Sequence, residues 1–481
     1  MPINSFLYPA TQVVSGYEVA NSLRFNDGSS DYLNRTQGTP TNADKYTLSV
    51  WVKRCGLTTS DYHYIASFDG GSNPREHIRF NDTTDQLTWY FRDSGGTATS
   101  LTTNRLFRDV SAWYHIVCSY DSTQSTSSNR QKIYINGVQE TSFSSSGYVA
   151  QNTDANLNTN SNNIKIGALG VSSPSAGFFD GYMAEYVFID GQALDPTSFG
   201  EFDEDSGIWK PIDVSGLTFG TNGFYLDFEN SGSLGADVSG NGNNFTVNNL
   251  TAIDQTTDTC TNNFVTLNPL AQTTTKGTVS QGNLEYDRQG STANWVAIGS
   301  TIGVTTGKWY YEYKVIDAGT PNQGSQIGFV NYDVSNFQSD SSSDLSSTGE
   351  YSFYSGGGNI FANGSSLGTF EGGYADGDII MVAIDLDNSY AYWGKNGSWI
   401  NSGDPTSGSS GTGGFSITGV GTNIFAPAIA HREDGNGQAN FGNPPFTISS
   451  GNADGDGYGN FEYAVPSGYY ALNTKNLAEY G

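Results

Sequence analysis

The sequence predicts an all-β protein: two jelly-roll-like β-sandwich domains joined by a turn-rich connector. Gly accounts for 60 of the 481 residues and aromatic residues for 13%. Short apolar stretches alternate with Gly, Asn and Asp turns along most of the chain, which is typical of sandwich domains. Helix-forming runs of Leu, Glu, Lys and Ala are almost absent. Regularly spaced Trp, Tyr, Phe, Ile and Val argue against disorder, the other interpretation of so much Gly and Ser.

The length is sufficient for two or three domains of roughly 150 residues each. We expect an extended N-terminal segment, a first sandwich, a connector with short strands, a second sandwich and a C-terminal tail. Their boundaries are placed at residues 1–20, 21–200, 201–275, 276–447 and 448–481. The stretch around Pro269, TLNPLAQTTT, is typical of a linker.

Residues 376–401 predict a three-strand meander. The run from Ile379 to Ile384 is apolar at every position, as in a strand buried on both faces. Turn formers follow it, then Tyr390 to Trp393 as the return strand. An Asn-Gly turn at Asn396 precedes a third strand that begins at Ser398.

The strand pattern of the first half starts at Ser22. In KYTLSVWVKR, alternation places Leu48, Val50 and Val52 on one face and Trp51 on the other. The series SVWVKR, AWYHIVCSYD, KIYINGVQE and FFDGYMAEYVFIDGQAL resembles the concanavalin A-like, laminin G-like sandwich family over roughly residues 20–200. This resemblance implies binding of glycans or proteins, with polysaccharide hydrolysis as a minority activity.

The second half resembles the SPRY family over about 170 residues. The segments that carry this resemblance are GKWYYEYKV, QIGFV, DGDIIMVAIDLDN, YWGKNGSW and FAPAIA with ANFG. SPRY domains are binding modules whose partner contacts lie in loops at one edge of the sandwich. The pairing of the two modules is similar to virion proteins of marine tailed bacteriophages, of the tail-fibre or surface-display type.

The net charge of the chain is −27, from 21 Lys and Arg against 48 Asp and Glu. This charge disfavours binding to nucleic acid or anionic lipid, because both need a basic surface. No apolar run is long enough to span a bilayer, and the N-terminus lacks the pattern of a secretory signal. We therefore expect a protein made in the cytoplasm without membrane insertion, and the resemblance to phage proteins implies a place on the virion.

The cysteines and histidines do not form a recognisable site. Three widely spaced cysteines indicate buried thiols rather than a disulfide framework, with Cys55 and Cys118 in strands. None of the four histidines has a neighbouring ligand at zinc spacing. The Gly-rich stretches lack the following helix that a phosphate cradle needs.

The enzyme alternative depends on one acidic string. Hydrolases on lectin-like folds place three carboxylates at alternating positions of a strand. The nearest string is residues 201–205, EFDED, but it lies in a turn-rich stretch after the last strand of the first module. An acidic, solvated linker explains it better.

Calcium is the possible metal, and no cofactor is required. The oxygen-rich loop of Asp237, Asn241 and Asn243 is the best candidate for a Ca²⁺ site. Ordinary turn chemistry is the competing interpretation.

Aromatic residues are the candidates for ligand binding. Several strands carry aromatic residues on both faces, among them Trp89 to Phe91 and Tyr390 to Trp393. Their outward rings, together with Tyr374, Trp399 and Tyr354, are candidates for stacking on sugars or anchoring a protein. For any single ring, a place in the core is the competing interpretation.

The resulting hypothesis is a non-enzymatic virion protein, either a tail fibre or a capsid-exterior display protein. It would recognise a host-surface glycan or protein, contact other virion proteins and form a homo-oligomer. The alternatives are a polysaccharide depolymerase, a purely structural decoration protein and a secreted cellular lectin, the last of which would need an export signal.

Overall fold

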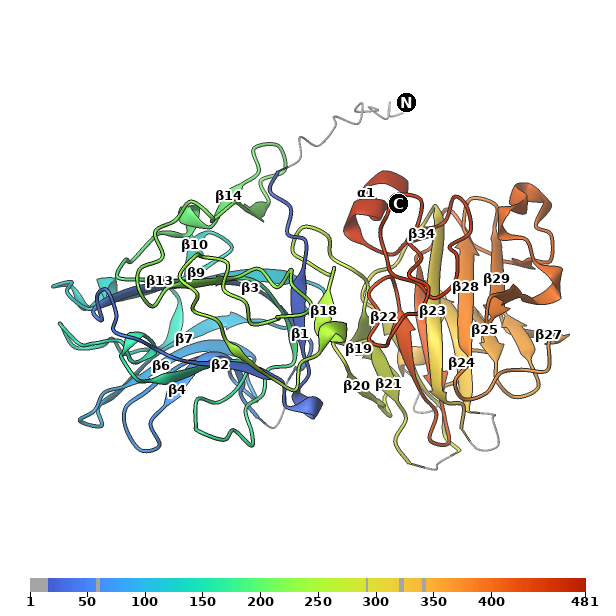
Figure 1. Cartoon of the computed structure of the whole chain (residues 1–481). Coiled ribbons are helices and arrows are strands. Elements are labelled where there is room, and N and C mark those ends of the chain that lie inside the picture. Colours follow the sequence, from blue (N-terminus) through green and yellow to red (C-terminus); the bar gives the residue numbers. More distant parts are fainter. Residues whose placement is uncertain (1–15, 58–60, 291–292, 320–323, 340–342) are drawn as a thin grey trace, which may run out of the picture.

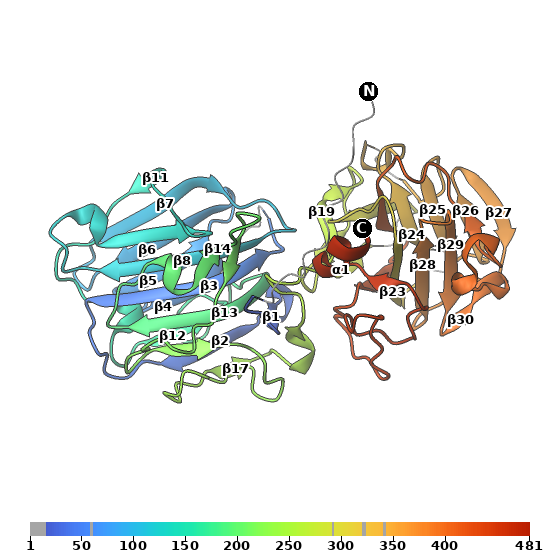
Figure 2. The same ribbon diagram turned by 90° about the horizontal axis from the view of Figure 1, so that it is seen from above.

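The computed structural model describes residues 16–57, 61–290, 293–319, 324–339 and 343–481. It confirms the predicted all-β fold class, with two β-sandwiches that lie side by side (Figure 1). Figure 2 views the same pair from above, with the C-terminal helix at the junction between the sandwiches. Within the described residues, no helix is long and apolar enough to cross a membrane.

The first sandwich consists of two antiparallel sheets, which we name after a central strand. The β3 sheet has the order β10-β9-β8-β3-β13-β1-β18, with β16 beside β13. Its strands are β10 (Val138–Gln139), β9 (Gln131–Ile135), β8 (Trp113–Asp121), β3 (Lys45–Arg54), β13 (Gly181–Asp190), β1 (Ser22–Phe25), β18 (Gln255–Thr256) and β16 (Phe224–Leu226). The β5 sheet has the order β11-β7-β6-β5-β4-β12-β2-β17. Its strands are β11 (Phe143–Ser146), β7 (Ala98–Leu106), β6 (Gln86–Arg92), β5 (Arg75–Phe80), β4 (His63–Asp69), β12 (Asn163–Ile166), β2 (Tyr32–Thr36) and β17 (Thr246–Asn248).

The second sandwich is built in the same way. The β24 sheet has the order β19-β22-β32-β24-β25-β26-β27. Its strands are β19 (Leu267–Gln272), β22 (Val296–Ser300), β32 (Phe425–His431), β24 (Ser325–Asn331), β25 (Glu350–Tyr354), β26 (Asn359–Ala362) and β27 (Ser365–Thr369). The β23 sheet runs β20-β21-β33-β23-β28-β29-β30, with β31 beside β29 and β34 beside β23. Its strands are β20 (Thr278–Ser280), β21 (Glu285–Asp287), β33 (Asn436–Asn440), β23 (Lys308–Asp317), β28 (Ile379–Asp385), β29 (Tyr390–Lys395), β30 (Ser398–Trp399), β31 (Phe415–Ser416) and β34 (Tyr470–Ala471).

Strand alternation forms the two cores. In β3, Leu48, Val50 and Val52 point between the sheets of the first sandwich, whereas Trp51 belongs to a separate cluster on the outer side. The sequence predicts this division, and the structure confirms it. Cys55 and Cys118 are buried free thiols, also as expected.

The predicted meander is present as β28, β29 and β30. Its first strand, β28, is buried on both faces for two different reasons. Ile380 and Val382 lie in the core between the sheets. Met381 and Ala383 face the opposite way and are covered by residues of the C-terminal segment, including Phe461 and Tyr469. Residues 448–481, expected as a tail, therefore complete the second sandwich and end in helix α1 (Thr474–Tyr480).

The prediction of a connector over residues 201–275 is wrong. Strands β16, β17 and β18 pair with β13, β2 and β1, so they extend both sheets of the first sandwich. The stretch around Pro269, expected as a linker, is strand β19 of the second sandwich. These pairings join residues far apart in sequence, and for that reason a local pattern does not reveal them.

Between β13 and β16, strands β14 (Gly200–Phe202) and β15 (Trp209–Pro211) form a hairpin on the outer side of the β3 sheet (Figure 1). Trp209 anchors it: its indole N–H donates to Nδ1 of the buried His115, at 2.9 Å. Gly137 has a φ of 78°, and a Cβ there would lie 2.4 Å from the Trp209 ring. Burial lowers the pKa of His115 to about 3, so its ring is uncharged at neutral pH. The uncharged ring can accept the hydrogen bond from Trp209.

A buried ion pair fixes the junction between the sandwiches. The Lys53 ammonium lies 2.8 Å from the Asp258 carboxylate, and neither side chain is exposed to solvent. Lys53 also donates to the Asn263 side chain and the Phe264 carbonyl, and the Trp113 indole N–H donates to Asp258. The chain that enters the second sandwich is thus tied to β3 and β8 of the first.

The expected N-terminal segment, residues 1–20, lies mostly outside the described residues. Its described part runs along the first sandwich. The Tyr17 hydroxyl donates to Glu185, 3.1 Å away, and the hydroxyl of Tyr225 donates to the same carboxylate oxygen at 2.7 Å. Burial raises the pKa of Glu185 to about 7, although the two tyrosine hydrogen bonds lower it.

Lys53→Ala should lower the free energy of unfolding by about 3–5 kcal/mol, because it leaves the buried Asp258 carboxylate without its partner. Chemical denaturation of the full chain measures this loss. Lys45→Ala is the matched control: Lys45 is one-third exposed and its partner Asp121 keeps hydrogen bonds from Thr123 and Gln124, so the loss should stay below about 1 kcal/mol. Equal losses for the two variants would contradict the role given to the junction.

Glu185 should make stability depend on pH. Its folded-state pKa of about 7 exceeds the ordinary 4.5, so folding favours the protonated form. Its contribution is complete below the unfolded-state pKa and is lost as the pH rises through about 7. Relative to Glu185→Gln, the free energy of unfolding should therefore fall by about 3 kcal/mol between about pH 4 and pH 8. A difference between parent and variant that is the same at both pH values would refute this assignment.

Candidate functional site

The three aromatic residues expected to bind ligand do not form one site. Tyr374 is only 3% exposed, its ring packs on Phe353, and its hydroxyl donates to the Phe353 carbonyl. The prediction that the Tyr374 ring is exposed in a loop is wrong, because the loop places this ring in the core of the second sandwich.

Trp399 and Tyr354 are partly exposed but lie in different surroundings. Trp399 packs edge-on to Tyr310 under the C-terminal segment. Tyr354 contacts the Trp295 ring, and its hydroxyl accepts a hydrogen bond from Arg432. The structure therefore does not bring the predicted rings together, and ligand binding by either of these two stays a prediction.

The predicted calcium loop is held by its own hydrogen bonds. The Asp237 carboxylate accepts hydrogen bonds from the backbone N–H groups of Tyr225, Ser239 and Asn243. The side-chain N–H groups of Asn241 and Asn243 donate to backbone carbonyls between residues 220 and 223, and the Asn243 oxygen accepts from the Arg35 guanidinium.

These residues fit Ca²⁺ poorly. A cation would have to displace the backbone hydrogen bonds of Asp237 and lie beside the positive charge of Arg35. Turn chemistry accounts for the loop instead. Among the described residues, no group of three or more His, Cys, Asp or Glu is placed to hold a metal ion. Calcium binding stays a prediction.

The acidic string at residues 201–205 forms part of the β14–β15 hairpin and its turn. Asp203 accepts hydrogen bonds from the Ser206 amide and hydroxyl and forms an ion pair with Lys210. The Ser206 amide hydrogen bond, more than any other contact, holds the pKa of Asp203 below its usual range. Glu201 also pairs with Lys210. A carboxylate that stays ionised cannot supply the proton that the general acid of glycoside hydrolysis donates.

A better candidate is the outward face of the β5 sheet. Ile78, Trp89 and Leu101 of strands β5, β6 and β7 point into the core, so the residues between them point outward. The strand register places these outward residues in three rows across the sheet, Tyr64–Arg79–Thr88–Thr102, Ser67–His77–Tyr90–Ser100 and Asp69–Arg75–Arg92–Ala98.

A groove of about 270 Å³ crosses this face. Two tyrosine rings lie in it, Tyr62 from the start of β4 and Tyr90 from β6. The other lining residues carry hydroxyl, amide or charged groups; they are Arg79, Asn81, Asp82, Thr83, Thr84, Gln86, Thr88, Ser100 and Thr102. Aromatic faces next to many hydrogen-bonding groups provide the two kinds of contact that a sugar ring makes, stacking and hydroxyl hydrogen bonds.

Arg79 lies at the centre of these aromatic rings. Its guanidinium is 3.6 Å from the centre of the Tyr62 ring, 5.5 Å from that of Tyr64 and 5.9 Å from that of Tyr90. One amino group donates to the Tyr64 hydroxyl at 2.9 Å. Among the described residues, no carboxylate lies within ion-pair distance of Arg79, and its Nε has no hydrogen-bond partner. Nε is buried, so the N–H groups left for a ligand are those on the two terminal amino groups that do not bond Tyr64.

This outward face carries three arginines, and Asp82 in the groove and Asp69 beside Arg75 offset part of their charge. Arg75, Arg79 and Arg92 point outward from neighbouring strands, and their rows contain one carboxylate, Asp69, which pairs with Arg75 at 3.1 Å. His77 is buried beneath Tyr64 and Tyr90; burial lowers its pKa, so it adds no charge at neutral pH. On a chain of net charge −27, such a face should attract acidic groups.

A further hollow of about 460 Å³ lies beside the β14–β15 hairpin, lined by Trp51, Trp113 and Trp209 among others. These rings are 4–9% exposed, and the indole N–H groups of Trp113 and Trp209 donate to Asp258 and His115. The rings are therefore used mainly in packing the hairpin and the junction.

Comparison with known proteins identifies a family match in the first sandwich. Residues 27–197 match the family described as the concanavalin A-like lectin/glucanases superfamily. Among curated proteins, none is similar to this chain. The matched stretch contains strands β4 to β7, so the groove lies inside it.

Several solved structures are similar to parts of the chain. One is the SPRY domain of human HERC1, at 17% identity over 36% of this chain and 96% of that chain, with a TM-score of 0.28. Another is a heptameric SAP-like pentraxin from Limulus polyphemus, at 14% identity over 37% and 80%, also with a TM-score of 0.28. A putative carbohydrate binding protein from Bacteroides ovatus ATCC 8483 shows 18% identity over 48% and 59%, with a TM-score of 0.33.

The sequence contains a signal for this outward face. In QLTWYFR every second residue is apolar, and in REHIRF Ile78 and Phe80 follow the same alternation, with the buried Glu76 at the third inward position. The residues between them include Arg75, His77, Arg79, Tyr90 and Arg92. Two neighbouring strands with the same alternation predict a basic, aromatic outward face.

Proposed function

We propose that this chain is a non-enzymatic carbohydrate-recognition protein that binds glycans in the groove of the β5 sheet. The observation that carries the proposal is the arrangement of Tyr62, Arg79 and Tyr90 in one groove, surrounded by hydroxyl and amide side chains. The match of residues 27–197 to a lectin and glucanase superfamily supports it.

The groove favours acidic saccharides, such as those with carboxylate or sulfate groups. Arg79 is held in place by tyrosine rings and has N–H groups to donate, and charge-assisted hydrogen bonds from a planar guanidinium are well suited to these anions. Arg75 and Arg92 lie in the next outward row of the same strands and add to the positive potential along the face.

Catalysis is not part of the proposal. Glycoside hydrolysis needs a pair of carboxyl groups on either side of the bond. The described residues that line the groove include one carboxylate, Asp82, whose oxygen accepts hydrogen bonds from the Thr83 amide and hydroxyl. Binding without turnover is the activity that this residue set supports.

We further propose that the recognition takes place at the surface of a virus particle, on a tail fibre or on the capsid exterior, with a host-surface glycan as the partner. The pairing of the two sandwich types in one chain supports this proposal. It also assumes assembly with other virion proteins and copies of this chain. A particle whose attachment to host cells is unaffected by the loss of this chain would leave a decoration role instead.

Tyr90→Ala should weaken glycan binding about threefold to tenfold, because it removes a stacking face without disturbing the core. The measurement is the affinity of the full chain for the strongest ligand on an array of acidic and neutral oligosaccharides. Phe202→Ala is the matched control, since it removes an exposed ring from the opposite side of the same sandwich. Unchanged binding by Tyr90→Ala, or no binding by the parent chain to any glycan, would count against the proposal.

Arg79→Gln should weaken binding of an acidic oligosaccharide about tenfold or more, since it removes a charge-assisted hydrogen bond. Arg79→Lys should recover part of the loss, because it keeps the charge but not the planar set of donors. The parent affinity should fall as salt rises from about 0.05 M to 0.5 M. Lys132→Gln removes one positive charge from the other sheet and should have little effect. An affinity that is independent of both Arg79 and salt would contradict the acidic-sugar assignment.

A further inference from the structure

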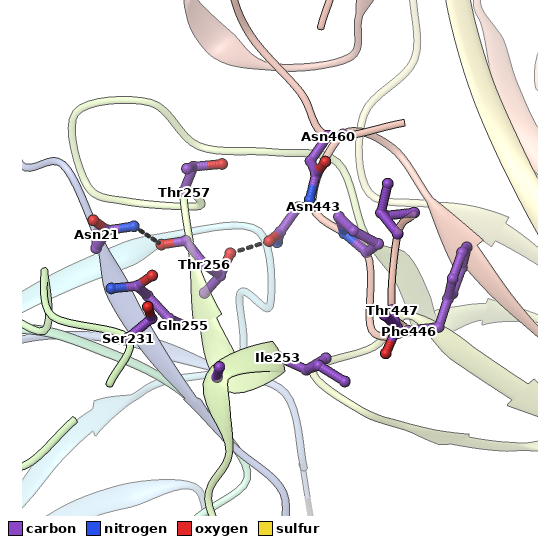
Figure 3. A pocket seen from close by; sticks show the side chains of 14 residues that line it. Asn21, Ser231, Ile253, Gln255, Thr256, Thr257, Asn443, Phe446, Thr447 and Asn460 are labelled. Atoms are coloured by element: carbon purple, nitrogen blue, oxygen red, sulfur yellow. Dashed lines mark hydrogen bonds between the residues drawn. The ribbon is translucent and has the colours of Figure 1, made fainter. Parts of the chain in front are cut away.

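A second concave site lies between the two sandwiches (Figure 3). This pocket has a volume of about 390 Å³, within the range of about 300–1,000 Å³ that is usual for ligand sites. One wall is formed by residues of the first sandwich around β1 and β18. The opposite wall is formed by residues 442–448, which follow β33, and by Asn460.

The walls of the pocket are polar but uncharged. Eight of the lining side chains are amides or hydroxyls: Asn21, Ser231, Gln255, Thr256, Thr257, Asn443, Thr447 and Asn460. The other lining residues are Ala252, Ile253, Gly442, Pro444, Phe446 and Ile448, so no lining side chain is acidic or basic. Such walls can satisfy a ligand rich in hydroxyl groups, but they offer nothing to neutralise a charged one.

Several of these polar groups are available to a ligand. Asn443 is 3% exposed, its oxygen accepts from the Thr256 hydroxyl, and its amide nitrogen has no hydrogen-bond partner among the described residues. The hydroxyls of Thr257 and Thr447, both exposed, also form no hydrogen bond within the described chain. A buried amide donor left unsatisfied costs about 1–3 kcal/mol, so a ligand that accepts from Asn443 would gain from it.

The pocket is held open by contacts across the junction. The buried Arg24 guanidinium donates to the Pro444 carbonyl on one side and to the Ile253 carbonyl on the other, and it pairs with Asp254 at 3.4 Å. Thr256 is hydrogen-bonded to Asn21 on one wall and to Asn443 on the other, as Figure 3 shows. Because these bonds join both walls, little ordering is required when a ligand enters.

From this arrangement we propose that the inter-sandwich pocket is a second binding site, whose ligand is an uncharged polyhydroxylated molecule, that is, a neutral sugar. The amide and hydroxyl side chains hydrogen-bond its hydroxyls. Ile253, 37% exposed, and Pro444 pack against its C–H faces. The site is independent of the β5-sheet groove, where arginines favour an acidic sugar. Since both sandwiches contribute walls, binding also stabilises their junction.

The test is isothermal titration calorimetry of the full chain, which measures its affinity for cellotriose, maltotriose, mannotriose and N,N′-diacetylchitobiose. We expect at least one of them to bind with a dissociation constant in the millimolar range or below. Thr447→Trp, which fills the pocket from an exposed position, should weaken that binding at least tenfold. Asn443→Ala should also weaken it, by the loss of the free donor. Thr422→Trp, at an exposed position elsewhere in the second sandwich, is the matched control and should bind like the parent.

Thermal unfolding of each variant shows whether it is folded, so that lost binding can be assigned to the pocket. No binding of any of the four sugars at millimolar concentration would overturn the proposal. So would binding that Thr447→Trp leaves unchanged, or binding that Tyr90→Ala abolishes, since the latter would place the sugar in the groove. The function proposed for the groove is tested separately, by the glycan binding of Tyr90→Ala and Arg79→Gln.

Discussion

The alternation of inward and outward residues along β5 and β6 is the constraint on which the candidate site depends. A two-layer sandwich must bury one face of each sheet, and Ile78, Trp89 and Leu101 do so here. The same pleat fixes where Arg79 and Tyr90 stand, because an outward residue cannot move to the core without shifting the whole strand register. The core thus positions the site: the rigid sheet holds the guanidinium among tyrosine rings before any ligand arrives.

A second constraint acts at the junction, where Lys53 and Asp258 are buried together and Arg24 joins carbonyls from both sandwiches. Charges taken out of water are tolerated only when they are paired and hydrogen-bonded, so these groups favour one relative placement of the two bodies. That placement creates the uncharged pocket beside them. The two candidate sites consequently differ in origin and in chemistry: one face of a single sheet with arginines, and one cleft between domains with amides and hydroxyls.

Much of the fold could be predicted from sequence, and the reasons are local. The apolar run from Ile379 to Ile384 and the alternation in KYTLSVWVKR each specify a strand and its buried face.

The errors come from contacts between distant parts of the chain. Three-residue strands such as β16 have no periodicity of their own and are recognised only beside β13. Tyr374 looked like an exposed loop ring because no local signal shows that its loop turns inward. The outward face of β5 and β6 could have been predicted from its alternation, but the register that lines up Arg79 with Thr88 could not.

The most direct test of the account is to map where a glycan touches the folded chain. Hydrogen–deuterium exchange of the full protein, with and without a saturating acidic oligosaccharide, reports this without any mutation. Slower exchange is expected in the turn between β5 and β6 and along β7, with little change in the β24 sheet. Protection confined to the second sandwich, or to the β3 sheet, would contradict the central claim that the outward face of the β5 sheet is the recognition surface.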